Sequence, residues 1–199
     1  MKIIFTKKEI RDIIIATLAL TLAFKFAFTG IYNANAFVFM IYLLISFLAV
    51  VTGFVGHEMM HKAIAFRYNY YAEFIKWNTG LLLALVTSLF GIVFAAPGAT
   101  TIYGYVDRDN NGKISAAGPI YNLFVGILFL LLSLVGVLHF LIFVAVINFW
   151  LGFFNLLPIP PLDGSKIYKW NLPLYIILMI VSLILVLQFI FGVSILPLK

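Results

Sequence analysis

The sequence contains no cysteine and few charged residues. Without cysteine the chain can form no disulfide and no thiolate metal site, and a cysteine nucleophile is excluded. Only 10% of its 199 residues are charged, whereas a soluble domain averages about 25%. The chain therefore lacks the polar surface that a water-exposed globule needs, and its composition indicates an integral membrane protein in a lipid bilayer.

Basic residues give the chain a net charge of +6, but their placement does not indicate nucleic-acid binding. They stand between apolar segments, as the cytoplasmic loop charges of membrane proteins do. Four precede the first apolar segment, whereas the connection 32–36 that follows it carries no charge. We expect a multi-pass protein with no nucleic-acid partner and with its N-terminus and charged loops in the cytoplasm.

Five apolar segments are long enough to predict transmembrane helices, since a span needs about 20 apolar residues. They are residues 12–31, 37–66, 117–138, 139–157 and 172–196. A sixth apolar stretch, 80–97, is harder to place. No internal repeat or appended soluble domain is visible, so we expect one transmembrane domain over residues 1–199.

The stretch between the second and third predicted spans has a different pattern. Residues 70–77 alternate loosely, and residues 98–106 are rich in β-branched and aromatic side chains, so both predict short strands. The Asp-Asn-Asn-Gly sequence at 109–112 predicts a turn. The expected fold is an all-α polytopic membrane protein with five to six transmembrane helices and a small β-hairpin or sheet element in this stretch.

An H-E-x-x-H motif, residues His57 to His61, lies inside the second apolar segment. The spacing places both imidazoles on one helical face, where they can share a zinc ion, and Glu58 beside them can take a proton from water. Ionisable groups inside a membrane segment are energetically costly and are by default functional. The motif therefore predicts a catalytic zinc site rather than a polar packing cluster.

A catalytic zinc site normally has three protein ligands. Asp163 is the strongest candidate for the third, because three prolines make the segment around it non-helical, and such backbone at membrane depth lines a cavity or is buried in protein. His139 is a weaker candidate at a predicted outer turn. The other acidic candidates are Glu73, Asp107 and Asp109.

Three motifs together resemble the site-2 protease family of intramembrane zinc metalloproteases, in its compact form without PDZ or CBS domains. They are the H-E-x-x-H motif, the sequence N-x-x-P-x-P-x-x-D-G at residues 155–164, and the sequence G-P-x-x-N at residues 118–122. The resemblance covers roughly residues 37–170. It implies one Zn²⁺ per chain, ligated by His57, His61 and Asp163, with Glu58 as catalytic base and Asn155 near the scissile carbonyl.

The expected activity is hydrolysis of peptide bonds in transmembrane protein substrates. Asn155 would bind the substrate carbonyl or backbone, or else satisfy the broken backbone near Pro158. Either predicted strand could hold an unwound substrate by strand addition; candidate residues on the second strand are Gly98, Ala99, Thr100 and Thr101. Structural residues near the site are expected to be Gly118, Pro119, Asn122, Pro158 and Pro160.

Topology constrains the stretch 80–97. His61 lies towards the cytoplasmic end of its span, so Asp163 reaches it only if an even number of complete crossings intervenes. Three apolar stretches lie between them, and we therefore expect 80–97 to be re-entrant or interfacial. The alternative is an ordinary sixth helix with the zinc site nearer the middle of the membrane.

Two non-enzymatic readings compete with the protease. A membrane metal-binding protein or transporter would be expected to carry further ligands along its path, and the apolar segments offer few apart from His139. An inactive relative acting as a binding or chaperone module would be expected to have lost a catalytic residue, and here each expected position is filled. The sequence leaves the oligomeric state open.

Overall fold

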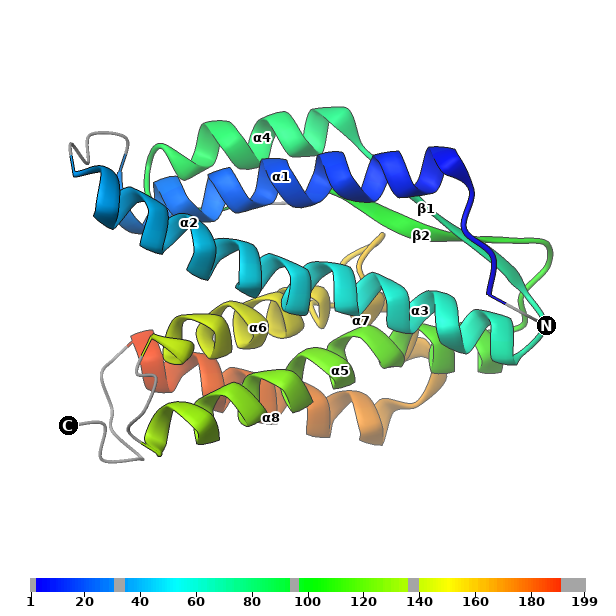
Figure 1. The fold of residues 1–199 in the computed structure, drawn as a ribbon. Coiled ribbons are helices and arrows are strands. Elements are labelled where there is room, and N and C mark those ends of the chain that lie inside the picture. The colour runs from blue at the N-terminus through cyan, green and yellow to red at the C-terminus, as the bar shows by residue number, and fades with distance from the viewer. Residues whose placement is uncertain (1–2, 31–34, 94–96, 136–139, 191–199) are drawn as a thin grey trace.

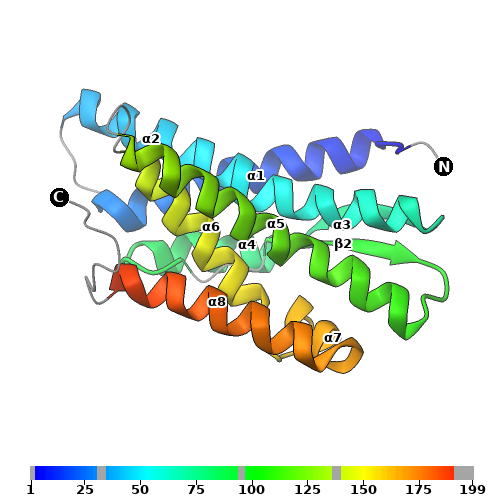
Figure 2. The same ribbon diagram turned by 90° about the horizontal axis from the view of Figure 1, so that it is seen from below.

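The computed structural model describes residues 3–30, 35–93, 97–135 and 140–190. Its elements in chain order are α1 (Lys7–Thr29), α2 (Ala36–Val50), a π-helical segment (Val51–Val55), α3 (Gly56–Arg67), β1 (Tyr71–Lys76), α4 (Asn78–Ser88), β2 (Gly98–Tyr103), α5 (Arg108–Leu134), α6 (Leu141–Asn155), α7 (Asp163–Trp170) and α8 (Leu172–Ile190). The expected mostly helical fold with a small sheet is therefore observed. The long helices run side by side along one axis (Figures 1 and 2).

Within the described ranges, four helical stretches are long and apolar enough to cross a membrane. They are α1, the continuous stretch from α2 to α3, α5 and α8. The predicted fourth span appears as α6, which has 15 residues and extends about 22 Å, less than the roughly 30 Å of bilayer hydrocarbon. The expected five to six spans thus correspond to four long helices and two shorter apolar ones.

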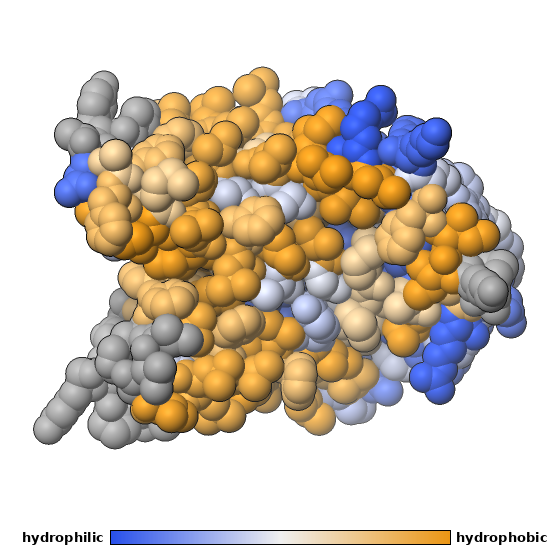
Figure 3. Space-filling view, viewed as in Figure 1, coloured by the Kyte–Doolittle hydropathy of each residue, from blue (hydrophilic) through white to orange (hydrophobic). Residues whose placement is uncertain are grey.

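The surface of the molecule fits a membrane-embedded protein. Apolar side chains cover most of the face in Figure 3, and hydrophilic ones gather at the end where the β1–β2 sheet lies. Many large hydrophobic side chains are exposed, among them Phe37, Leu44, Phe124 and Leu131. Such a surface would aggregate in water but is suited to lipid.

The sheet consists of β1 and β2, paired antiparallel from Tyr71 opposite Tyr103 to Lys76 opposite Gly98. Both predicted strands are therefore present, slightly shorter than expected. Since Lys76 and Gly98 are partners, the chain leaves and re-enters the sheet at the same place. The segment between Lys76 and Gly98, which contains the 11-residue helix α4, therefore leaves the sheet and returns to the same end of it. Its re-entrant or interfacial placement in a membrane stays a prediction.

The predicted turn at residues 109–112 is wrong, because these residues form the first turns of α5. Asp107 caps the helix by accepting a hydrogen bond from the Asn110 N–H at 2.9 Å. Gly112 then leaves room for Trp170, whose indole occupies the position that a Cβ there would take. Capping and this long-range packing override the local turn preference of the sequence. Consequently α5 starts nine residues before the predicted span at 117.

A buried ion pair ties α1 to α3 and to the sheet. Lys62 on α3 and Glu9 on α1 are almost fully buried, and the Lys62 Nζ lies 2.5 Å from Glu9 Oε2. The other carboxylate oxygen of Glu9 accepts a hydrogen bond from the Phe74 N–H of β1 at 3.0 Å. The Lys62 ammonium also lies 4.2 Å from the centroid of the Phe5 ring. One glutamate thus connects three elements of the fold.

Removing one member of this pair should strongly destabilise the protein. Lys62→Met leaves the Glu9 carboxylate buried without its cation, and we expect a loss of about 3–5 kcal/mol in the free energy of unfolding. The double variant Glu9→Gln with Lys62→Met removes both charges and keeps an acceptor for Phe74, so it should recover most of that loss. Thermal unfolding in detergent measures both, and equal melting temperatures of wild type and Lys62→Met would contradict the prediction.

Candidate metal centre

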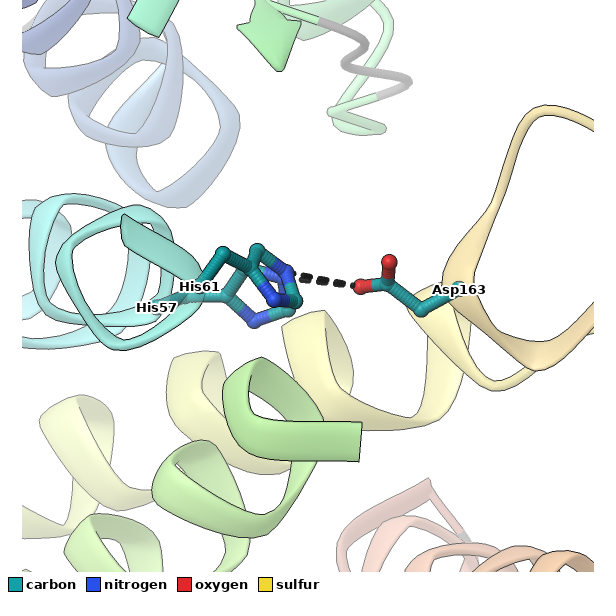
Figure 4. A group of neighbouring side chains, drawn as sticks. All are labelled: His57, His61 and Asp163. Atoms are coloured by element: carbon teal, nitrogen blue, oxygen red, sulfur yellow. Dashed lines mark hydrogen bonds and ion pairs between the residues drawn. The ribbon is translucent and has the colours of Figure 1, made fainter. Parts of the chain in front are cut away.

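Three metal-binding side chains converge in the interior of the molecule (Figure 4). His57 and His61 lie one turn apart on α3, and Asp163 is the first residue of α7. Asp163 Oδ2 lies 3.1 Å from His57 Nε2 and 3.0 Å from His61 Nε2, and the two nitrogens are 2.9 Å apart. All three residues are buried. The structure therefore brings together the three ligands predicted from the sequence.

The second ring nitrogen of each histidine is already engaged. His57 Nδ1 lies 2.5 Å from Asn122 Oδ1, and His61 Nδ1 lies 2.7 Å from the Ile114 carbonyl oxygen. Both acceptors are on α5. Because each Nδ1 donates its proton to an oxygen, each Nε2 retains its lone pair and is directed at the partner ligands. This is the arrangement that a metal-binding histidine pair requires.

The donor set fits zinc. A four-coordinate zinc holds nitrogen and oxygen ligands at about 2.0–2.2 Å, which places neighbouring ligand atoms roughly 3.3 Å apart. The spacings of 2.9–3.1 Å seen here need to widen by only a few tenths of an ångström. In the metal-bound form the Nε2 lone pairs of both neutral imidazoles and the Asp163 carboxylate would all face the ion. The ionised carboxylate is the form that binds metal.

Gly118 allows α5 to approach the histidines. A Cβ at this position would lie 2.5 Å from His57 Nε2 and 2.6 Å from His61 Nε2, a distance that only a shift of the helices could relieve. Gly118 therefore permits close packing of α5 against the metal helix. Pro119, which we expected at the start of a span, lies instead in the interior of α5.

Two asparagines support the histidine pair from within the membrane-facing helices. Asn122 Nδ2 donates to the Gly53 carbonyl at 2.7 Å and to Asn148 Oδ1 at 3.3 Å. Asn148 on α6 in turn donates to the Val144 carbonyl at 2.9 Å. Both asparagines are fully buried. Asn122 thus bonds to two other helical segments, which is compatible with the structural role predicted for it, and its amide oxygen also contacts His57.

Asn148 was missed in the sequence, although a signal was present. It is an amide within the apolar segment 139–157, and polar groups at such positions are rare enough to need a reason. Gly53, the other partner of Asn122, lies in the π-helical segment Val51–Val55 that directly precedes the metal helix. Single-turn π segments inside longer helices occur frequently at functional sites.

A cavity of about 130 Å³ opens beside the three ligands. Its walls include Glu58 from the H-E-x-x-H motif and Asn155 from the end of α6. Asn155 Nδ2 donates to the Leu151 carbonyl of its own helix at 3.0 Å. Asn155 thus borders the cavity, and its contact with a substrate stays a prediction.

The residues predicted to bind substrate on β2 divide into two groups. Gly98, Ala99 and Thr100 line the cavity. Thr101 pairs with Glu73 of β1, and it is exposed and not among the cavity-lining residues of the described structure. The cavity therefore reaches along β2 from Gly98 as far as Ile102.

The proline-rich segment serves to present Asp163. The described residues 156–162 form neither helix nor strand, as expected, and they carry the chain from α6 to α7. Pro158 and Pro160 lie within this segment and do not themselves line the described cavity. The segment packs closely, because a Cβ on Gly164 would collide with the Leu156 and Leu157 carbonyls.

The remaining candidate ligands are placed elsewhere. Glu73 accepts a hydrogen bond from the Thr6 hydroxyl, Asp107 caps α5, and Asp109 pairs with Lys113. His139 lies outside the described residues. Within the described chain, His57, His61 and Asp163 form the one group of this kind that could hold a metal ion.

The chain is 40% identical over 174 residues to a Methanocaldococcus jannaschii protein named "Putative zinc metalloprotease". That similarity covers 84% of this chain and 86% of the relative. The chain belongs to peptidase family M50. The M50 family model, that of the site-2 proteases, matches residues 132–186. No solved structure matches the chain.

Membership of family M50 agrees with the geometry of the site. The range matched by the family model contains Asn155 and Asp163 but not the histidine pair, which the fold brings to Asp163 from α3. Together with the long apolar helices, the comparisons make this M50 protein a metallopeptidase of the membrane. The resemblance recognised in the three sequence motifs is confirmed.

The asparagine pair should contribute to metal affinity. Asn122→Ala removes the acceptor that orients His57, and loss of such a partner typically weakens metal binding by about 10- to 100-fold. Asn148→Ala should weaken binding less, since Asn122 keeps its bond to the Gly53 carbonyl. Zinc affinity is measured by competition with a coloured chelator in detergent. Asn171→Ala, which removes a helix cap distant from the site, is the matched control, and unchanged affinity in Asn122→Ala would refute the role.

Proposed function

We propose that the protein is an intramembrane zinc metalloprotease that hydrolyses peptide bonds of transmembrane protein substrates. The observation that carries the proposal is the convergence of His57, His61 and Asp163, buried beside a cavity that also contains Glu58. These three side chains would hold one zinc ion per chain and leave a coordination position towards the cavity, as catalytic zinc sites do. Family membership supports the same chemistry.

The chain supplies the proton transfers that hydrolysis needs. Zinc bound at the site would act as a Lewis acid on water and on the scissile carbonyl. The Glu58 carboxylate accepts a proton from the attacking water and delivers it to the nitrogen of the leaving amine. The Asn155 amide donates a hydrogen bond to the carbonyl oxygen or to the substrate backbone. Each of these groups borders the same cavity.

The substrate would bind as an extended strand along β2. A transmembrane helix hides its peptide bonds in its own hydrogen bonds, so it must unwind before cleavage, and the unwound backbone needs new partners. In β2, every second residue directs its backbone N–H and C=O towards β1. Thr100 and Ile102 are the residues between these, so their backbone groups point away from β1, and both residues line the cavity. The Thr100 N–H is already donated to Glu58. The Thr100 carbonyl and the backbone of Ile102 are therefore the groups that remain for the substrate.

We further propose that the site faces the cytoplasm. The hydrophilic end of the molecule coincides with the sheet and the N-terminal end of α1 (Figures 1 and 3). Lys7, Lys8 and Arg11 lie at that end, which favours a cytoplasmic location. Water reaches the site by the shortest path from this side. A re-entrant α4 accords with the return of the chain from Lys76 to Gly98.

Metal binding without catalysis, or metal transport, explains the arrangement of the site less well than proteolysis does. Transport needs a series of ligands along a path, whereas the described residues offer a single metal-binding group. Neither binding nor transport requires the carboxylate of Glu58 beside the ligands. Cleavage by the purified protein decides between these functions.

Glu58→Gln should lower the rate of substrate cleavage by about 10²- to 10⁴-fold, because the amide cannot accept the proton of the attacking water. Zinc binding should be unchanged, since Glu58 is not one of the converging ligands. The assay uses the purified protein in detergent or liposomes with a zinc-loaded wild type and a transmembrane substrate. Full cleavage by Glu58→Gln would exclude the mechanism, and zinc binding by a wild type that cleaves nothing would favour a binding protein.

Asp163→Ala should lose both zinc and activity, because it leaves two histidines to hold the ion. Metal analysis of the purified variant gives the zinc content, and readdition of zinc after chelation should restore activity in the wild type but not in the variant. Asp109→Ala is the matched control, since its carboxylate pairs with Lys113 away from the site. A full zinc complement in Asp163→Ala would remove Asp163 from the ligand set.

A further inference from the structure

Thr100 makes an unusual pair of contacts with Glu58. The Thr100 N–H donates to Glu58 Oε2 at 2.7 Å, and the Thr100 hydroxyl lies 2.8 Å from the same oxygen and 3.1 Å from the Glu58 backbone carbonyl, the more distant of its two acceptors. The other carboxylate oxygen, Oε1, has no hydrogen bond to any residue that the structure describes. One oxygen of Glu58 is therefore held by two donors, and the other has no partner among the residues that the structure describes.

The register of the sheet explains why the Thr100 N–H is available. Thr100 is the cross-strand partner of Phe74. The Phe74 N–H points away from β2 and donates to Glu9, and the Thr100 N–H points away from β1 and donates to Glu58. This is the pattern of a non-hydrogen-bonded antiparallel pair. A glutamate thus caps each outer edge of the sheet at the same register position.

The strand that carries Thr100 is fixed relative to the metal helix. Glu9 bonds both to the Phe74 N–H and to Lys62, the residue that follows His61. The Glu9 bridge therefore holds β1 against α3, and β2 is paired to β1. Gly98 allows the close pairing, because a Cβ there would collide with the Ile75 carbonyl. Thr100 is consequently held in a fixed position relative to the histidines. A contact from Thr100 can therefore fix the orientation of the Glu58 carboxylate relative to the metal site.

We propose that Thr100 is a positioning residue for the catalytic base: it anchors Glu58 Oε2 and so assigns Oε1 as the oxygen that takes the proton from water. This inference rests on the proposed protease function. It adds that Glu58 Oε1 is the atom that accepts the proton and that Thr100 determines this choice. A free carboxylate rotates and presents either oxygen, whereas one held by two donors presents the other oxygen in a constant direction. Groups held in this way by neighbouring hydrogen bonds react from a fixed geometry.

Kinetics on three variants test the positioning role. Thr100→Val keeps the shape and the backbone N–H but removes the hydroxyl, and we expect kcat to fall about 10-fold or more, the size typical of a lost bond to a charged group. KM and zinc affinity should stay within about 2-fold. Thr100→Ser restores the hydroxyl and should recover most of kcat. Thr29→Val, which removes a hydroxyl bonded to the Lys25 carbonyl on α1, controls for a general effect of the substitution.

Hydrogen exchange of the metal-free protein provides a readout that needs no activity. The Thr100 amide should exchange slowly in the wild type and at least about 10-fold faster in Glu58→Ala, which removes its acceptor. The Thr101 amide belongs to the residue paired with Glu73 inside the sheet, so it should keep its protection in both proteins. Fragmentation mass spectrometry that resolves single amides distinguishes the two positions.

Two outcomes would overturn the proposal. One is a Thr100 amide that exchanges equally fast with and without the Glu58 carboxylate, and the other is a Thr100→Val variant with the kcat of the wild type. A fall in kcat that Thr100→Ser fails to recover would also count against it. If the wild type cleaves no substrate, the protease function fails, but the exchange experiment still decides whether Thr100 holds Glu58.

Discussion

The buried histidines and Asp163 of the candidate metal centre need partners, because the surrounding chain is apolar and unpaired polar groups buried there are costly. The three ligands face one another with their acceptor atoms 2.9–3.1 Å apart, an arrangement that a bound cation would satisfy. Their outer atoms are satisfied by α5, through Asn122 and the Ile114 carbonyl. The position of α5 against α3 therefore follows from the needs of two histidines, and Gly118 makes that position sterically possible.

The same constraint shapes the two-stranded sheet. An isolated pair of strands exposes backbone donors at both edges and is marginally stable. Here Glu9 accepts from one edge and Glu58 from the other, at cross-strand partners Phe74 and Thr100. One of these carboxylates is neutralised by Lys62, and the other faces the cavity. The sheet is thus stabilised by the helix that carries the site, and it in turn orients a residue of that site.

How much of this could be predicted depended on whether the signal was local. The spacing of His57 and His61 is encoded within one helical turn, and Asp163 is marked by the prolines that precede it, so the convergence of these three side chains was predictable. The two strands were also predictable from their side-chain pattern. The partners Asn148 and Glu9 were not, because nothing near them in sequence indicates which distant group they will meet. The start of α5 was mispredicted for the same reason, since Trp170 packs on it from far along the chain.

The return of Asp163 to the level of His57 does not depend on where a membrane lies. Helices α5 and α6 run antiparallel (Figure 2). Gly126 packs against Phe149, and Asn122 is bonded to Asn148. The chain therefore moves away from the site along α5 and comes back along α6. The segment between β1 and β2 adds no net displacement, because it begins and ends at paired residues. The contacts alone thus bring α7 to α3, whereas the even number of membrane crossings stays a prediction.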